Sequence, residues 1–354
     1  MDSSHALLKE LTEAFGPPGH ESDIAGIMKR HLRGLGQVTQ DRLGSVICRK
    51  TGRAEEPRIM LAGHMDEVGF MVKSVTKEGF IKFLPMGGWW GHVLLAQRVR
   101  IRTRKWDVIG VVGSKPPHEL KDEERRKVLD LGDMFIDVGA TSQFDVKKRL
   151  AVRPGDPIVP EAGFDVMAND RLYLAKALDN RMGCALVVDV LRRLAKTPHP
   201  NTVYGVATTM EEVGLRGAQT SAASVKPQVA IALDVGIAHD TPGSGGDGEE
   251  KLGGGVGILA YDATLIPNVA LRDLAIDICE RQKIPYHLGT VERGGTDAGR
   301  FHVYDTGVPS LVIFTPTRYI HSHNTIMDRK DYDAAVRLLV ELTKRLDKKT
   351  VAGL

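Results

Sequence analysis

Three short, continuous apolar runs constrain the fold of this chain most, because each is followed within two residues by polar side chains that can bind metal ions. The runs cover residues 59–63, 202–209 and 229–233. Uninterrupted apolar segments of about four to eight residues are typical of strands buried on both faces of a parallel sheet. In an open α/β sheet the crevice beyond the carboxyl ends of the strands binds ligands, so side chains at several strand ends can converge on one site.

The candidate metal ligands are carboxylates and imidazoles, found at these strand ends and at two further places: His64, Asp66, Asp179, Glu211, Glu212, Asp234 and His321. Carboxylates with two histidines and no thiolate suit a hydrolytic site for zinc, cobalt or manganese rather than a structural zinc site. The set holds more acids than one ion requires, which indicates two ions. In two-metal hydrolases the ions share a bridging carboxylate and a water of lowered pKa.

The first three candidates each have an ordinary structural explanation when taken alone. His64 and Asp66 point the same way if the strand continues through them, so Asp66 can orient the imidazole from behind. A lone histidine at a strand end is, however, more often a satisfied polar residue than a ligand. Asp179 begins an amphipathic pattern over residues 179–194, and there it also suits the N-cap of a helix.

The remaining candidates are open to the same kind of alternative. Glu211 and Glu212 are adjacent, so at a strand end they face opposite sides, and one carboxylate can bind metal while the other handles a proton. The alternative for this pair is a solvated acidic turn. Asp234 lies in an apolar context, where an unpaired carboxylate needs a cation or strong hydrogen bonds nearby. His321 follows an apolar segment and a turn, and His323 competes for the same role.

The order of the patterns predicts two domains, for which a chain of 354 residues with 42% hydrophobic residues has room. Helical stripes and apolar strands predict a mixed, largely parallel α/β sheet sandwiched by helices. Between them, short alternating segments separated by Gly and Pro turns predict a small β-rich domain. We therefore predict an α/β catalytic domain of residues 1–68 and 166–354, interrupted by an inserted β-rich domain of residues 69–165.

Helix boundaries are predicted from apolar stripes and capping residues. The first two helices cover about residues 7–15 and 21–35, and each ends at glycines. Another helix follows Asn268, and the last covers about residues 329–346 with Asp328 as its cap.

Charge and cysteine content exclude several classes of protein. The formal net charge is only +3, with basic and acidic residues interleaved, so nucleic acid and membrane surfaces are not predicted partners. No segment approaches the roughly 20 apolar residues of a membrane-spanning helix. Cys48, Cys184 and Cys279 are far apart and form no CxxC, which favours a reducing compartment. We predict a cytoplasmic protein.

Two segments have no assigned chemistry. The mixed-charge run within residues 119–130 is typical of a solvated loop or helix face, although a long exposed loop can also serve as a subunit arm or an active-site lid. The Gly-rich segment 242–248 is typical of a mobile loop. Residues 252–257 are also Gly-rich but lack the strand, spacing and helix of a dinucleotide-binding fingerprint.

Six segments, in order along the chain, resemble the M42 family of metallo-aminopeptidases. They are residues 62–69 (AGHMDEVG), 176–181 (KALDNR), 209–217 (TMEEVGLRG), 232–235 (ALDV), 294–298 (GGTDA) and 318–323 (RYIHSH). The family includes tetrahedral, dodecameric aminopeptidases and glutamyl or deblocking aminopeptidases, and some members have been labelled cellulases or endoglucanases. The resemblance covers nearly the whole chain and implies a zinc-peptidase-like fold.

The resemblance also implies a role for each candidate ligand. His64 and Asp234 would bind one metal ion, Glu212 and His321 the other, and Asp179 would bridge the two. The ions would be zinc or cobalt, with manganese as a further choice. Many members of the family have proline at the position of His323, so this histidine is a departure from the family pattern beside the expected ligand.

Further roles follow from the same resemblance. Glu211 would be the general base, and Asp66 would lie behind His64. The bond between Asp179 and Asn180 would be a cis peptide, a form that without proline usually marks a functional site. Asp297, in the GGTDA segment, would hold the substrate or shape the site.

The function implied by the resemblance is removal of N-terminal residues from short peptides by attack of a metal-bridging water. The inserted domain would mediate dimers, and the dimers would assemble into a tetrahedral dodecamer. A metal-dependent deacylase of non-peptide amides would use the same ions and water. A glycosidase with Glu211 and Glu212 as its acid pair is disfavoured, because glycosidase carboxylates stand roughly 5 to 9.5 Å apart across the substrate. A non-catalytic assembly protein is disfavoured because the proposed base and every proposed ligand are present.

Overall fold

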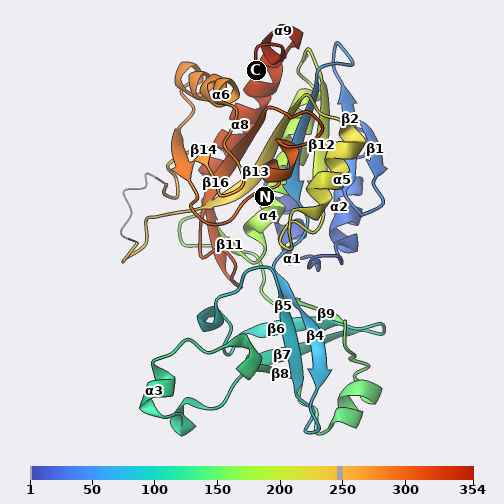
Figure 1. The fold of residues 1–354 in the computed structure, drawn as a ribbon, viewed down its shortest axis with the longest axis vertical. Coiled ribbons are helices and arrows are strands. Elements are labelled where there is room, and N and C mark those ends of the chain that lie inside the picture. Colours follow the sequence, from blue (N-terminus) through green and yellow to red (C-terminus); the bar gives the residue numbers. More distant parts are fainter. Residues whose placement is uncertain (1, 245–249) are drawn as a thin grey trace.

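A computed structural model describes residues 2–244 and 250–354 of the chain. The molecule has two lobes, a larger one in which helices cover a sheet and a smaller one built of strands (Figure 1). The expected loop at residues 242–248 lies mostly outside the described residues. No described helix is long and apolar enough to cross a membrane. All three cysteines are buried and unpaired.

The larger lobe is built on one mixed sheet, whose four central strands β12, β3, β13 and β16 run parallel. Their strongly apolar sequences are buried on both faces, as predicted from the apolar runs. Antiparallel strands extend the sheet on both sides, and β14 and β15 continue from β16. Within the described residues the sheet has the order β1 (Gln37–Gln40), β2 (Val46–Thr51), β12 (Thr202–Thr208), β3 (Arg58–His64), β13 (Val229–Ile237), β16 (Ser310–Arg318), β17 (Thr325–Asp328), β11 (Leu172–Ala175) and β10 (Asp165–Val166), with β14 (Val256–Tyr261) and β15 (Tyr286–Thr290) beside β16.

Helices cover both faces of this sheet. Alternate residues of β3 face opposite cores: Leu61 belongs to the core that includes residues of α1, α2, α4, α6 and α8, whereas Met60 belongs to the core that includes residues of α5 and α7. Asp328 caps α8 as predicted, accepting from Lys330 N, and α6 follows Asn268 as predicted, with the Asn268 side chain accepting from Leu271 N as its cap. The helices are α1 (Ser3–Glu13), α2 (Ser22–Leu32), α4 (Leu178–Leu194), α5 (Arg216–Val225), α6 (Val269–Gln282), α7 (Ala298–Phe301), α8 (Arg329–Arg345) and α9 (Lys348–Val351).

The smaller lobe is a closed antiparallel barrel around its own apolar core. The predicted inserted β-rich domain is thereby confirmed as part of the fold. In the described residues its strands follow the order β4 (Gly69–Val75), β5 (Ile81–Met86), β8 (Phe135–Asp137), β7 (Asp107–Gly113), β6 (Arg98–Arg102) and β9 (Pro157–Pro160). Short helical turns at Gly91–Val93, Pro117–Glu119, Leu131–Asp133 and Asp145–Arg149 connect them. Part of the mixed-charge run forms the short helix α3 (Asp122–Arg125), in which Asp122, Glu123 and Arg125 are exposed.

Candidate metal centre

The candidate ligands come together at one edge of the sheet. His64 is the last residue of β3, Asp234 lies in β13, and the turn after β12 carries Glu211 and Glu212. Because these strands are parallel, their carboxyl ends meet at the same edge. His321 arrives from the turn that follows β16, next to β13 in the sheet. The strand arrangement thus explains how ligands far apart in sequence gather at one place.

Asp179 lies between the two histidines. Its Oδ1 is 3.1 Å from His64 Nε2, and its Oδ2 is 3.2 Å from His321 Nε2. Burial raises the pKa of Asp179, but the hydrogen bonds and the charges of His321 and His64 together outweigh burial and hold the pKa well below its usual range. One carboxylate therefore faces two imidazoles, which is the arrangement required of a group that bridges two ions.

Asp179 does not cap the helix that follows it, which was its alternative role. Asp179 and Asn180 have non-helical backbone angles, and the peptide bond between them is cis. Asn180 caps the regular part of the helix instead, because its Oδ1 accepts from Gly183 N at 2.9 Å. Its Nδ2 also donates to Leu233 O at 2.7 Å, so Asn180 connects α4 with β13 beside Asp234.

Two overlapping groups of side chains could each hold a metal ion. One contains His64, Asp179 and Asp234, the other Asp179, Glu212 and His321, and within each group the ligand atoms lie within 4.8 Å of one another. These groups coincide with the two ligand sets that the family resemblance implies. A third overlapping group joins His64 with both residues of the Glu211–Glu212 pair.

The electrostatics of these groups fit divalent cations. Glu212 Oε1 is buried without a hydrogen-bond partner. Burial, followed by the nearby charge of Asp179, raises the pKa of Glu212 to about 8, and burial raises that of Asp234 to about 7. Crowded, buried carboxylates are unfavourable unless cations compensate them. With imidazole nitrogens and carboxylate oxygens but no thiolate, the donors suit zinc, cobalt or manganese.

Asp66 connects His64 with the turn that carries the two glutamates. His64 Nδ1 lies 3.1 Å from the Asp66 carbonyl oxygen and 3.5 Å from Asp66 Oδ1. The same carboxylate accepts the backbone N–H of Glu211 at Oδ1 and that of Glu212 at Oδ2, both at 3.0 Å. Asp66 therefore stands behind His64, and it also fixes the backbone from which the neighbouring carboxylates extend.

Glu211 is placed on the His64 side of the cluster. Its Oε2 lies 3.8 Å from His64 Nε2, and the residue is 8% exposed. Burial raises the pKa of Glu211 well above its usual value, and the charges of Glu212 and Asp234 act in the same direction against the opposing effect of His64. A strongly shifted pKa in a buried carboxylate beside the candidate ligands marks Glu211 as a candidate functional residue.

His321 and His323, which competed for the same role in the sequence, have different contacts in the structure. His321 Nε2 lies 3.5 Å from Glu212 Oε2 in addition to its contact with Asp179. His323 instead lies between the two lobes, where its Nε2 is 2.9 Å from the carbonyl oxygen of Arg98 in β6. Burial lowers the pKa of His323 to about 4, so the ring is neutral at physiological pH. His323 thus contacts the barrel and belongs to neither ligand group.

The barrel lobe also covers part of the cluster. Gly87 and Gly88, which follow β5, pass directly over two of the ligands. A Cβ atom at Gly87 would lie 3.3 Å from Glu212 Oε2, and one at Gly88 would lie 3.2 Å from His321 Nδ1. Gly87 also has φ +89°, a conformation that favours glycine. Both lobes therefore contribute to the surroundings of the ligands.

Asp297 lies behind the strand ends rather than in an open part of the site. It is 2% exposed, and its Oδ2 accepts a hydrogen bond from Thr208 Oγ1 at 2.5 Å. This placement favours a role in shaping the site, although contact of Asp297 with substrate remains a prediction.

A buried group of charges beside the ligands was missed by the sequence reasoning. Lys176 and Arg181 both contact the carboxylate of Glu67, at 2.7 and 3.3 Å. Arg181 also donates to the carbonyl oxygens of Leu11 and Gly16. Glu67 directly follows Asp66, and Lys176 and Arg181 flank Asp179. The signal available in the sequence was the position of these charges inside the segments that carry the ligands.

An α/β sheet with two carboxylate-and-histidine groups sharing one aspartate at its strand ends is the arrangement of a metal-dependent hydrolase. The chain belongs to the M42 glutamyl aminopeptidase family, whose sequence profile matches residues 44–338. It is accordingly a metallo-aminopeptidase, a hydrolase acting on peptide bonds.

Similar proteins extend over nearly the whole chain. The putative aminopeptidase FrvX of Escherichia coli K12 is 40% identical over 336 residues, which cover 94% of this chain and 93% of that protein. The crystal structure of a TET aminopeptidase from a marine sediment archaeon of the Thaumarchaeota is 47% identical with a TM-score of 0.97, covering 100% and 99% of the two chains. The TET1 peptidase of Pyrococcus horikoshii, which can assemble into a tetrahedron or a large octahedral shell, is 30% identical with a TM-score of 0.86 over 97% and 100%.

Proposed function

We propose that this aminopeptidase removes N-terminal residues from short peptides at a centre that holds two divalent metal ions. The observation that carries the proposal is the position of Asp179, which presents one carboxylate oxygen to His64 and the other to His321. His64 and Asp234 would hold one ion, Glu212 and His321 the other, and Asp179 both. Zinc and cobalt fit this donor set best, and manganese is a further choice.

Two divalent ions, when bound, supply Lewis-acid polarisation of a carbonyl group and a water of lowered pKa. Glu211 acts as the general base: it accepts a proton from the attacking water at a carboxylate oxygen and returns the proton to the leaving amine. The raised pKa of Glu211, caused first by burial, supports this role because a base that must also act as an acid needs a pKa near the working pH. Asp66 holds the amides of Glu211 and Glu212 and the imidazole of His64 in place.

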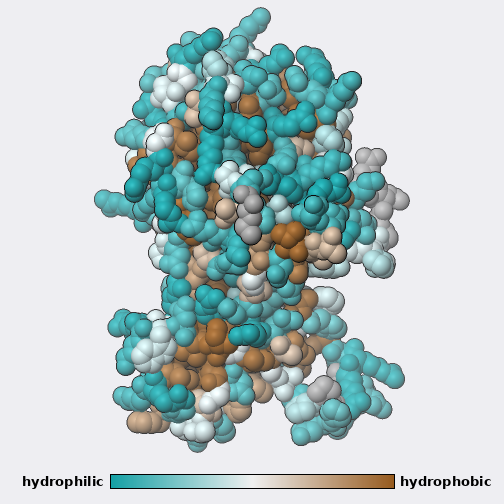
Figure 2. Space-filling view, turned by 180° about the vertical axis from the view of Figure 1, so that it is seen from behind, coloured by the Kyte–Doolittle hydropathy of each residue, from teal (hydrophilic) through white to brown (hydrophobic). Residues whose placement is uncertain are grey.

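We further propose that the enzyme is a homo-oligomer in which the barrel, within an inserted domain of residues 69–165, forms the dimer contact. Several barrel side chains are apolar yet exposed, among them Leu84, Ile109 and Val111 on β5 and β7. Apolar side chains gather on the barrel lobe (Figure 2). A tetrahedral assembly of such dimers is the form we expect, on the model of the TET1 peptidase.

The assembly is tested by placing charges on β7. The double variant Ile109→Asp, Val111→Asp is expected to sediment as a smaller particle than the wild-type protein, because both side chains point outward from the barrel. An unchanged particle size would show that another surface forms the contact.

The activity is tested with metal-stripped protein to which zinc, cobalt or manganese is added back. The substrates are aminoacyl chromogenic amides with a free amine, their N-acetylated counterparts, and a chromogenic glycoside. Metal-dependent cleavage of the free-amine substrates alone is expected for an aminopeptidase. Cleavage restricted to acylated amides would indicate a deacylase, and cleavage of the glycoside would indicate a glycosidase.

A further inference from the structure

The connection between α1 and α2 brings a buried carboxylate to the turn that carries Glu211. Its sequence is Gly16-Pro-Pro-Gly-His-Glu21. Gly19 has φ +79°, which favours glycine, and His20 N donates to Pro17 O at 2.9 Å to close a tight turn. This turn folds the Glu21 side chain back on the connection, where Glu21 Oε1 accepts from Gly19 N at 2.9 Å.

The same oxygen of Glu21 reaches across the molecule to Met210. Glu21 Oε1 accepts the backbone N–H of Met210 at 3.0 Å, and Glu21 is only 7% exposed. The next two amides, of Glu211 and Glu212, are bound by the carboxylate of Asp66. Three consecutive backbone N–H groups are therefore held by two carboxylates, which come from separate parts of the chain.

Met210 needs such support because of its own backbone. Its φ of +54° lies in the left-handed region, which is unfavourable for a residue with a side chain. A residue in this region persists when the surrounding structure holds it there. Since Met210 directly precedes Glu211, a change of its backbone angles would turn the Glu211 side chain away from His64.

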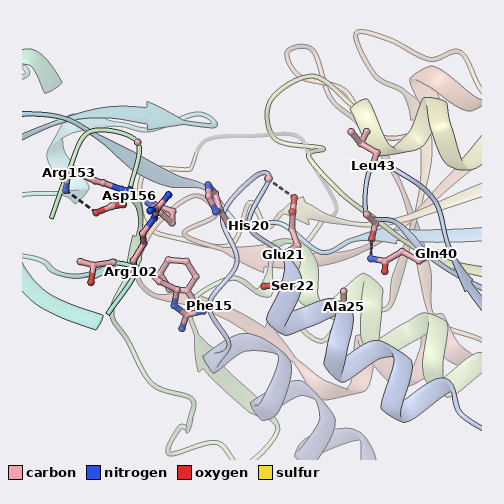
Figure 3. A pocket seen from close by; sticks show the side chains of 16 residues that line it. Phe15, His20, Glu21, Ser22, Ala25, Gln40, Leu43, Arg102, Arg153 and Asp156 are labelled. Carbon is pink, nitrogen blue, oxygen red and sulfur yellow. Dashed lines mark hydrogen bonds and ion pairs between the residues drawn. The ribbon is translucent and has the colours of Figure 1, made fainter. Parts of the chain in front are cut away.

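Glu21 lies at the wall of a pocket outside the candidate metal centre. It lines an open pocket of about 440 Å³ between the two lobes, together with His20, Arg102, Arg153 and Asp156 (Figure 3). The pocket therefore offers a control on its opposite wall. Asp156 is buried and belongs to the barrel, and among the described residues its side chain accepts hydrogen bonds only from Arg153, from the backbone N–H at 2.9 Å and from Nε at 3.4 Å.

We propose that Glu21 is a positioning residue for catalysis, which fixes the Met210 amide and so keeps Glu211 directed at the reacting water. The inference rests on the role of Glu211 in the proposed function. Glu21 touches neither substrate nor the ligand side chains in this arrangement; it acts through one backbone hydrogen bond.

The test compares Glu21→Ala, Glu21→Asp and Glu21→Gln with wild type and with the control Asp156→Ala. Glu21→Ala removes the acceptor and is expected to lower kcat roughly 10- to 100-fold with little change in KM, because small misplacements of a catalytic group have effects of this size. Glu21→Gln keeps a carbonyl oxygen for Met210 N and is expected to retain most of the activity. Glu21→Asp keeps the charge but withdraws the acceptor by one methylene, so it should resemble Glu21→Ala. Asp156→Ala should turn over like wild type.

Two measurements separate this role from general destabilisation. Metal content should be the same in all variants. Hydrogen exchange of the segment around residues 206–216 should be faster in Glu21→Ala and Glu21→Asp than in wild type, with no change in α6. The proposal is overturned if Glu21→Ala and Glu21→Asp keep wild-type kcat, or if Glu21→Gln loses as much as Glu21→Ala, since the charge would then be what matters. If Glu21→Ala does not fold, the opposite behaviour of Glu21→Asp and Glu21→Gln still decides the question. Failure of the proposed function is distinct, because it would appear as an inactive wild-type enzyme, whereas the exchange measurement needs no activity.

Discussion

Lys176 Nζ lies 2.7 Å from both carboxylate oxygens of Glu67, and both side chains are 2% exposed. Burial lowers the pKa of Lys176 to about 8, with the Glu67 charge acting against this effect. The pair lies between the segments that supply Asp66 and Asp179, so its integrity affects the framework of the metal centre.

Removing one partner of this pair should therefore be strongly destabilising. Lys176→Ala is expected to lower the free energy of unfolding by about 3 to 5 kcal/mol, because it leaves the Glu67 carboxylate buried with less compensation. The measurement is denaturant unfolding of the metal-free protein. Arg281→Ala is the control, since Arg281 and Asp277 form an exposed pair and should contribute almost nothing. Equal effects of the two substitutions would contradict the prediction.

Substitution of Glu211 should reduce turnover, whereas substitution of Glu212 should reduce metal content. Glu211→Gln is expected to lower kcat by roughly 10² to 10⁴ while metal content stays intact, because the amide cannot accept the proton of the attacking water. Glu212→Gln should lower metal content itself, since Glu212 Oε2 faces His321 in one ligand group. Elemental analysis after gel filtration, combined with turnover of an aminoacyl amide, measures both effects. Retained activity in Glu211→Gln would remove its assigned role.

Substitution of His321 and of His323 should likewise have different effects, one on metal content and the other on stability. His321→Ala is expected to lose one metal ion per chain, whereas His323→Ala should keep both and lose stability instead. The stability loss is expected to be about 1 kcal/mol, because the Arg98 carbonyl oxygen loses one of its two donors and keeps the backbone N–H of Glu161. Metal content and thermal unfolding of both variants provide the measurement. Loss of metal from His323→Ala alone would reverse the assignment.

Asp331 should make stability depend on pH in a defined direction. It is buried, it accepts from Gly253 N and Gly255 N, and burial raises its pKa from 3.8 to about 6. Between these two values the folded protein binds a proton that the unfolded chain releases, so the contribution of Asp331 to stability is present below about pH 4 and is lost as pH rises to 6. The loss amounts to at most about 3 kcal/mol.

The measurement is the free energy of unfolding of wild type and Asp331→Asn at several pH values from 4 to 7. The variant does not titrate at this position, so the wild-type value minus the variant value should fall as pH rises through this range. A constant difference would show that the Asp331 proton is not linked to folding.

The central strands and the gathering of the candidate ligands could be predicted from sequence because both depend on local patterns. Apolar runs identified the central strands, and polar residues directly after them identified His64, Asp234 and the Glu211–Glu212 pair. The helix cap Asp328 was predictable for the same reason, since a cap bonds within its own first turn.

The supporting contacts could not be predicted in this way. Glu21 and Met210 are far apart in sequence, as are Glu67 and Lys176, and no local pattern records which backbone amide a buried carboxylate will meet. The role of His323 depends on the docking of the barrel against the larger lobe. Asp179 was ambiguous because its neighbour Asn180 takes the cap, which only the backbone angles reveal.

Gly87 and Gly88 lie over Glu212 and His321 without side chains of their own. The larger lobe therefore depends on the barrel lobe to complete the surroundings of these two residues. A larger lobe produced alone would leave these two ligands open to water and His323 without its acceptor. Trimming the protein to a minimal catalyst would thus require replacing the barrel segment that covers the candidate ligands, and a side chain at either glycine would press against one of them.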